Sequence, residues 1–193
     1  MKSVIGTIQF MRKIPLWSFC ILIMIITSCE DFTEVDPPNN QLTGLVVFED
    51  ASTVDAAFAH MYSELRNAAF TSGTTSGLTY LLGHYTDELN LYNPSFQSIE
   101  VYEENNVLPT DGYVQGFWNS GYTLIHASNS ILEGVGASTT LSSEDKKRFL
   151  GEAHFLRAFI HFYLTNLFGD IPYVESTDYR VNSTMGRMEA AMV

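Results

Sequence analysis

The chain has 193 residues, enough for one domain of ordinary size but too few for two large ones. It carries 22 acidic and 10 basic side chains, a formal net charge of −12. From Cys29 onward there are 22 acidic and 7 basic residues, a net charge of −15. Such a surface repels nucleic acid phosphates and offers no polybasic stripe to an anionic membrane, which argues against both partners. The two cysteines, Cys20 and Cys29, are too few for a disulfide framework or a four-thiolate zinc site.

The first 28 residues have the pattern of a bacterial signal peptide. The basic pair Arg12 and Lys13 precedes a largely apolar stretch over residues 14–26. These 13 residues are fewer than the roughly 20 that a membrane-spanning helix needs, so the segment is interpreted as the core of a signal peptide. We therefore predict that residues 1–28 are removed from the mature protein.

The signal peptide ends in a lipoprotein cleavage box, Ile26-Thr27-Ser28-Cys29. Small residues fit the peptidase cleft, and the Cys29 thiol is the group that receives diacylglycerol. We predict Cys29 as the lipidation site, which would anchor the protein to a membrane by its acyl chains. The alternatives are a chance cysteine after an ordinary signal peptide and, for the start of translation, Met11.

Residues 29–49 are predicted to form an acylated amino terminus and an extended tether. Two prolines, Pro37 and Pro38, push the residues before them out of the helical region. The acidic pair Glu30 and Asp31 is interpreted either as part of a solvated linker or as a signal for display on the outer surface.

Four segments of the remaining chain, 50–193, have apolar residues at the three- and four-residue spacing of a helix face. They span residues 51–69, 81–89, 112–132 and 142–168, with the third expected to stop at residues 134–136. Residues 91–109 and those after Pro172 are predicted to be irregular loops. The predicted fold class is all-α, built from tetratricopeptide-like antiparallel helix pairs.

The fourth helix has the clearest boundaries, because Ser142 can cap its start and Gly169 can end it. From residue 153 to 168 it has almost no polar face, which predicts a position at the centre of the core. Arg157 and Asn166 interrupt this apolar run, so each is expected to have a buried partner such as Glu152 or a loop carbonyl.

The sequence shows no assembled catalytic or metal site. The five histidines include no pair at the spacing of a zinc-binding helix, and GxSxG, P-loop and GxGxxG motifs are absent. No thiol would remain for catalysis once the signal peptide is removed and Cys29 is acylated. The carboxylate pairs Asp87-Glu88 and Glu103-Glu104 are interpreted as solvated or capping, since neighbours in sequence diverge in direction. We predict a non-catalytic protein that uses no cofactor and no metal.

Several motifs occur together in a fixed order. After the lipobox come Tyr85-Thr86-Asp87-Glu88-Leu89, then Trp118-x3-Tyr122-x2-Ile125-x3-Asn129, then Gly151-Glu152-Ala153-x-Phe155-Leu156-Arg157-Ala158, and finally Phe168-Gly169-Asp170-Ile171-Pro172. In this order and spacing they resemble the SusD/RagB family of bacterial outer-membrane lipoproteins. The resemblance covers residue 29 to about residue 187.

This resemblance implies a helical scaffold that sits as a lid on a SusC-like TonB-dependent outer-membrane transporter. It further implies capture of an oligosaccharide, or in some members a peptide, on the extracellular side of the outer membrane. Family members are considerably longer than this chain, so residues 50–193 are expected to be an incomplete, amino-terminal part of a SusD-like domain.

The segment 90–106 is the candidate binding loop. It offers aromatic rings and amides in an irregular stretch, a composition suited to stacking on sugar faces and bonding to sugar hydroxyls. The candidate glycan-binding residues are Tyr92, Asn93, Phe96 and Tyr102. The resemblance also implies glycan contacts from this loop.

Other interpretations remain open from the sequence alone. The aromatic residues of the loop could instead anchor it to the core. Trp118, Tyr122 and Asn129 lie at helix-face spacing and are assigned to packing between helices, where Asn129 would need backbone partners. The alternative function is a helical adaptor that binds only protein and has no ligand site, and an exported hydrolase is a third.

Overall fold

Three long helices dominate the computed structural model, which describes residues 44–193 except 69, 94 and 96. The helical elements, in chain order, are α3 (Gly44–Val47), α4 (Ala51–Ala68), α5 (Leu78–Tyr85), α6 (Gln97–Glu103), α7 (Gly112–Ala137), α8 (Ser143–Phe168), α9 (Tyr179–Asn182) and the 3₁₀ helix η2 (Ala190–Met192). The only β pairing within the described ranges is a single antiparallel bridge between Ile171 and Met188. The predicted all-α fold class is therefore confirmed. The predicted signal peptide, the lipidation site Cys29 and the candidate residue Phe96 lie outside the described residues.

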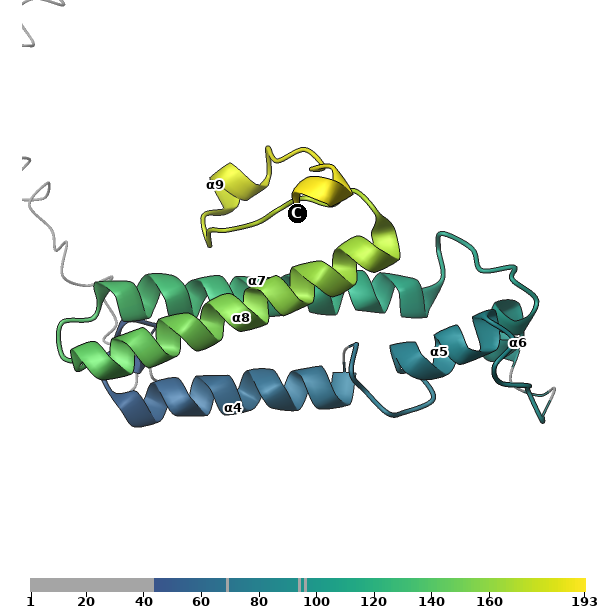
Figure 1. Ribbon diagram of the computed structural model, residues 1–193, viewed down its shortest axis with the longest axis horizontal. Coiled ribbons are helices and arrows are strands. Elements are labelled where there is room, and N and C mark those ends of the chain that lie inside the picture. Colours follow the sequence, from purple (N-terminus) through teal and green to yellow (C-terminus); the bar gives the residue numbers. More distant parts are fainter. Residues whose placement is uncertain (1–43, 69, 94, 96) are drawn as a thin grey trace, which may run out of the picture. The chain divides into compact units, whose positions relative to one another are not determined.

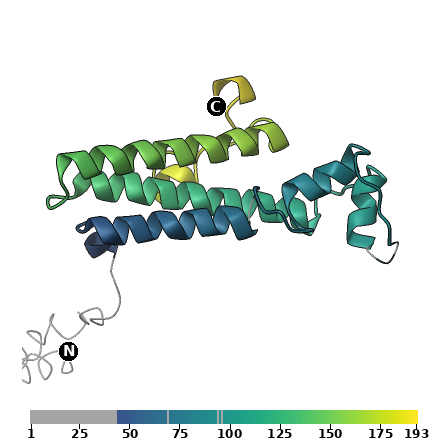
Figure 2. The same cartoon turned by 60° about the horizontal axis from the view of Figure 1, so that its bottom comes forward.

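Helices α7 and α8 form an antiparallel pair, and α4 lies alongside them (Figures 1 and 2). The boundaries predicted for α8 are confirmed by its caps. The Ser142 hydroxyl accepts a hydrogen bond from the Asp145 amide at 3.1 Å, and the helix ends at Gly169, whose φ of 70° favours a residue without a Cβ. None of the helices in the described part of the chain has both the length and the apolarity needed to cross a bilayer.

The core lies between these three helices. Phe58 of α4 stacks on Phe149 of α8, with ring centroids 5.9 Å apart. Gly121 of α7 allows a close approach, because a Cβ at this position would lie 2.9 Å from Leu164 Cδ2 and 3.0 Å from Phe70 Cζ. The fully buried aliphatic side chains of the same core include Val54, Leu81, Ile125, Val135, Ile160 and Leu164.

The residues that precede α4 connect the start of α4 to the end of α7. Asp50 Oδ1 accepts a hydrogen bond from the Ser52 amide at 2.8 Å and so caps α4. Phe48 packs against Gly134, where a Cβ would lie 2.0 Å from the Phe48 ring. Helix α7 was expected to stop at residues 134–136, but it continues to Ala137. Gly134 leaves space for the Phe48 ring and does not end the helix.

Three predicted segments differ from the structure. Residues 29–49 were expected to form an extended tether, but helix α3 spans Gly44–Val47 and Phe48 packs against the core. The second helix was expected over residues 81–89, but α5 begins at Leu78 and ends at Tyr85, and Asp87 has a left-handed φ of 61°. Residues 91–109, predicted to be irregular, contain the helix α6. This helix has few apolar positions, of which Ile99 and Tyr102 are buried, so its periodicity in the sequence is weak.

The second half of α8 is only partly central. Phe155 and Phe162 are each 64 % exposed, so one face of the helix is aromatic but not covered by the described residues. Asn166 is exposed and donates to the Phe162 carbonyl at 2.7 Å, which makes the expectation of a buried partner wrong for this residue. Arg157 donates to the Glu175 carbonyl at 3.4 Å, which is a loop carbonyl as expected, and to the buried Asn129 Oδ1 at 2.9 Å. Its carboxylate partner is Glu175, at 3.1 Å, and not Glu152.

Candidate functional site

The candidate binding loop begins where α5 ends. The amides of Glu88 and Leu89 both donate to the Gly83 carbonyl at 2.9 Å, which closes the helix and turns the chain back. The Leu89 side chain then lies directly over Gly83, where a Cβ would be 2.8 Å from Leu89 Cδ1. The absence of a side chain at Gly83 therefore fixes how the loop leaves the helix.

The loop is also tied to α6. The Leu91 amide donates to Glu103 Oε1 at 3.1 Å, and Asn93 Oδ1 accepts from the Ser95 amide at 3.0 Å in a local turn. Tyr92 lies between these two ties and is 100 % exposed. The candidate residues Tyr92 and Asn93 are thus both at the surface, and the ring of Tyr92 is accessible to a ligand.

Tyr102 has a different position from the other candidates. Its side chain is 4 % exposed, and its hydroxyl donates to Asp111 Oδ1 at 2.7 Å. The same carboxylate oxygen caps α7 by accepting from the amides of Tyr113 at 2.9 Å and Val114 at 3.1 Å. Burial and the hydrogen bond to Asp111 raise the pKa of Tyr102. This ring supports the base of the loop, as the alternative interpretation of the loop aromatics expects.

An apolar cavity of 290 Å³ lies beside Tyr102. Its lining comes from α5, the α6 region, α7 and the end of α8: Leu78, Leu81, Leu82, Tyr85, Tyr102, Val107, Val114, Phe117, Leu167 and Phe168. Tyr85 and Leu82 are partly exposed at its edge. With no carboxylate, histidine or amide in its lining, this cavity is suited to hold apolar surface.

The residues assigned from the sequence to helix packing do pack. The Trp118 ring meets Phe168 edge to face with centroids 5.1 Å apart, and the Tyr122 hydroxyl donates to the Pro172 carbonyl at 2.8 Å. Asn129 is fully buried and has the expected backbone partners, since Nδ2 donates to the carbonyls of Val174 at 3.2 Å and Ser176 at 3.4 Å.

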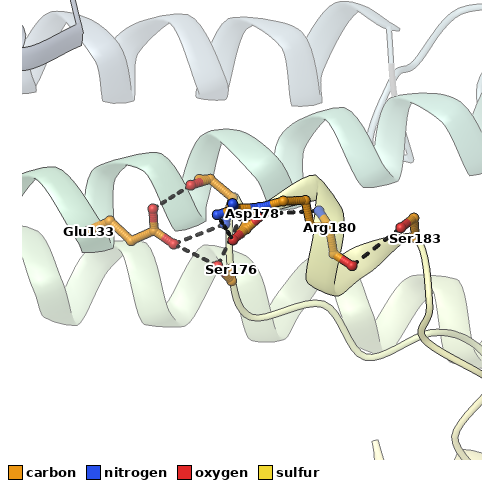
Figure 3. A network of polar contacts seen from close by, with 6 residues as sticks. Glu133, Ser176, Asp178, Arg180 and Ser183 are labelled. Carbon is orange, nitrogen blue, oxygen red and sulfur yellow. Dashed lines mark hydrogen bonds and ion pairs between the residues drawn. The ribbon is translucent and has the colours of Figure 1, made fainter.

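The segment that follows α8 is held against α7 by Glu133. Its carboxylate accepts hydrogen bonds from the Ser176 hydroxyl at 3.2 Å, the Thr177 amide at 2.9 Å and the Thr177 hydroxyl (Figure 3). Partial burial alone would raise the pKa of Glu133, but the bonds from Thr177 and Ser176 lower it on balance. Asp178 caps the short helix α9 and pairs with Arg180 in the same network.

Three residues that shape this region were not predicted as site residues. Glu103 and Asp111 act through partners nine or more positions away, and Gly83 acts through the approach of Leu89. Only Asp111 has a local signal, as an N-cap residue before α7. Within the described residues, no cluster of three or more potential ligands from His, Cys, Asp and Glu could hold a metal ion.

Comparisons with known proteins agree on one family. A SusD-like family model, described as "Starch-binding associating with outer membrane", matches residues 31–191. SusD-like proteins P2 and P25 of Formosa agariphila are each 28 % identical to the chain, over 82 % and 80 % of its length. A SusD-like protein of Bacteroides ovatus is 23 % identical over 83 % of the chain.

The fold is shared with a solved SusD-like carbohydrate-binding protein from Bacteroides fragilis. The TM-score is 0.57 at 21 % identity, and the match covers 76 % of this chain and 29 % of that one. The chain spans about 30 % of the length of the curated relatives, which places the match in one part of a longer protein. Because the family model matches most of the chain, the chain belongs to the SusD-like family.

Proposed function

We propose that this protein is a surface-exposed, lipid-anchored and non-catalytic lipoprotein that binds an oligosaccharide and acts with a SusC-like TonB-dependent transporter in nutrient uptake. The family supports a role in carbohydrate binding, and the lipobox supports an anchor at Cys29 of a chain on the extracellular side of the outer membrane. Bond breaking and translocation belong to other proteins in this proposal. Residues 1–28 act as the signal peptide, and the tether runs from Cys29 to the start of α3 at Gly44. The rest of the chain, including Phe48, which packs against Gly134, is part of the binding domain.

The observation that carries the proposal is the presentation of Tyr92. This ring is fully exposed, yet the backbone on both sides is fixed by Glu103 and by the local turn at Asn93. A rigidly held, solvent-facing ring is suited to stack on the apolar face of a pyranose. Asn93 completes the proposed contact surface, and Phe96, which lies outside the described residues, stays a predicted contact. The buried Tyr102 is bonded to Asp111 and has a supporting role.

Affinity gels loaded with different polysaccharides test the proposal. We expect the full chain to be retarded by one glycan and Tyr92→Ala to lose at least about 70 % of that retardation, since stacking on an aromatic ring contributes about 1 kcal/mol. The far-UV circular dichroism should not change. Phe96→Ala should act in the same direction.

Tyr179→Ala provides a matched control, because Tyr179 is also strongly exposed but lies on α9. Retardation that survives Tyr92→Ala and Phe96→Ala would remove the loop from the site. The uncovered aromatic face of α8, with Phe155 and Phe162, favours the adaptor as the second candidate function. No retardation on any glycan, together with co-purification of a large β-barrel, would select the adaptor.

A further inference from the structure

A groove lies along α7, which is distant in sequence from the candidate binding loop that carries Tyr92. Trp118, Tyr122 and His126 follow one another at steps of four, so they line one stripe of the helix. Two hollows, of 320 and 540 Å³, share these three side chains. The segment after α8 forms the other wall of the smaller hollow through Pro172, Val174 and Asn182.

The walls of this groove are fixed in place. Trp118 and Tyr122 have ring centroids 4.9 Å apart, and Phe168 supports Trp118 from the side. The hydrogen bond from the Tyr122 hydroxyl to the Pro172 carbonyl joins the helix to the opposite wall. Burial raises the pKa of Tyr122 to about 12, so this hydroxyl stays protonated and keeps donating. The network of Glu133 holds the same wall farther along α7 (Figure 3).

The polar groups of the groove have capacity left for a ligand. Asn182 Nδ2 donates to the Ser176 carbonyl at 2.7 Å, but its buried Oδ1 has no partner among the described residues. This oxygen is shielded from solvent, so the groove offers a ligand the exposed polar groups at its edge and not Asn182 Oδ1. Asn119 and Thr123 are exposed along the edge of the larger hollow and can reach further hydroxyls.

The charge around the groove differs from that of the chain as a whole. Although the net charge is −12, neither hollow has an acidic residue in its lining. The Arg187 guanidinium lies 5.9 Å from the centroid of the Trp118 ring and donates to the Asp170 carbonyl at 3.2 Å.

Arg187 also differs from three other arginines in that it has no carboxylate partner among the described residues. The ion pairs of the described residues involve Arg148, Arg157 and Arg180, and Arg187 takes part in none of them. A guanidinium beside an aromatic platform, with no carboxylate paired to it, is suited to receive an anionic group.

We propose that this groove is a second saccharide-binding site, specific for a pyranose that carries an acid group, either a carboxylate or a sulfate ester. The ring stacks on Trp118 and Tyr122, Asn119 and Thr123 bond to its hydroxyls, and Arg187 binds the acid group. This inference rests on the proposed function, because it names the class of sugar that the protein takes.

Trp118 itself can report binding. The sequence contains only two tryptophans, Trp17 and Trp118, so the full chain with Trp17→Phe has a single fluorophore in the groove. Trigalacturonic acid and a 6-sulfated galactose disaccharide should each be titrated, with the methyl ester of trigalacturonic acid as the uncharged match. We expect Trp118 emission to shift with at least one acid probe and the ester to bind at least about tenfold more weakly, since charge-assisted hydrogen bonds contribute about 1.5–3 kcal/mol. The two acid probes distinguish carboxylate from sulfate.

Substitutions then assign the contacts. Arg187→Gln should weaken the response to the acid probe by about tenfold and leave the response to the ester unchanged. Asn119→Ala should weaken both several-fold without touching a packed side chain, since Asn119 is exposed. Arg66→Gln removes an exposed arginine from α4, outside the groove, and should change neither.

The two proposals fail in different ways. Retardation on glycan gels with unchanged Trp118 emission for both acid probes would overturn the second site and leave the Tyr92 site in place. An equal response to acid and ester, or an acid response that survives Arg187→Gln, would overturn the assignment to acidic sugars. A Trp118 response that persists in Tyr92→Ala supports two separate sites.

Discussion

His161 combines deep burial with an incomplete set of hydrogen bonds. The residue is 2 % exposed, and its Nδ1 pairs with the Arg157 carbonyl at 2.9 Å. Because a carbonyl only accepts, Nδ1 carries the proton of the neutral ring. Nε2 has no partner among the described residues, and the ring lies 4.6 Å from that of Tyr173. Burial lowers the pKa of His161, with the charge of Arg157 adding to the effect and that of Glu175 opposing it.

This arrangement predicts a loss of stability in mild acid. A lowered pKa in the folded state means that the unfolded chain binds the proton first, as the pH falls below the ordinary value of 6.5. The contribution of the buried, neutral His161 to the free energy of unfolding is complete above that pH and decreases below it. Thermal unfolding between about pH 7.5 and pH 5 should therefore show a shallower decline for His161→Gln than for the parent. His154→Gln, at an exposed position of the same helix, should keep the slope of the parent; equal slopes for all three proteins would contradict the prediction.

At the scale of elements, the pairing of α7 with α8 depends on one glycine. Leu164 and Phe70 occupy the space beside Gly121, whereas nothing lies within 4 Å of a Cβ at Gly116 one turn earlier. Substitutions at these two positions of one helix should consequently have opposite signs.

Gly121→Leu should lower the free energy of unfolding by about 1–3 kcal/mol, because the added side chain overpacks the interface between the helices. Gly116→Leu should raise it by about 0.5–1 kcal/mol, because leucine favours helix more than glycine does and meets no neighbour. Urea unfolding followed by circular dichroism measures both. A stabilisation of similar size at both positions would mean that helix propensity, not packing, governs the pair.

The same elements show what periodicity can and cannot predict. Helix α8 could be predicted to within a residue because Ser142 and Gly169 mark its ends and apolar residues recur between them. Helix α6 could not, because its burial rests on contacts with α5 that no local pattern records. In the loop, ring type alone predicted binding for both Tyr92 and Tyr102, but the partner of Tyr102, Asp111, is a tertiary contact.

At the scale of the whole molecule, the aromatic face of α8 is the largest departure from expectation. Apolar residues at positions 153–168 predicted a central helix, but burial depends on which neighbours cover each face. Phe155 and Phe162 lie on a face that the described residues leave open, while Leu156 and Leu164 lie in the core. The region that matches this chain is about 30 % of the length of the curated relatives.

Exposure of this face predicts self-association of the isolated chain, because contiguous apolar patches drive contacts between molecules. The double variant Phe155→Ser and Phe162→Ser should bind less of a hydrophobic dye and sediment as a smaller species at high concentration. Its free energy of unfolding should change by only about 0.5 kcal/mol per site, as for other surface positions. Substitution of exposed Tyr179 by serine is the control, and unchanged sedimentation of the double variant would contradict the prediction.

The tie between the Leu91 amide and Glu103 has a consequence for kinetics. Because this hydrogen bond already holds the backbone next to Tyr92, a sugar that docks there orders less of the chain than it would on a free segment. Different glycans should therefore have similar association rate constants and differ mainly in their dissociation rate constants.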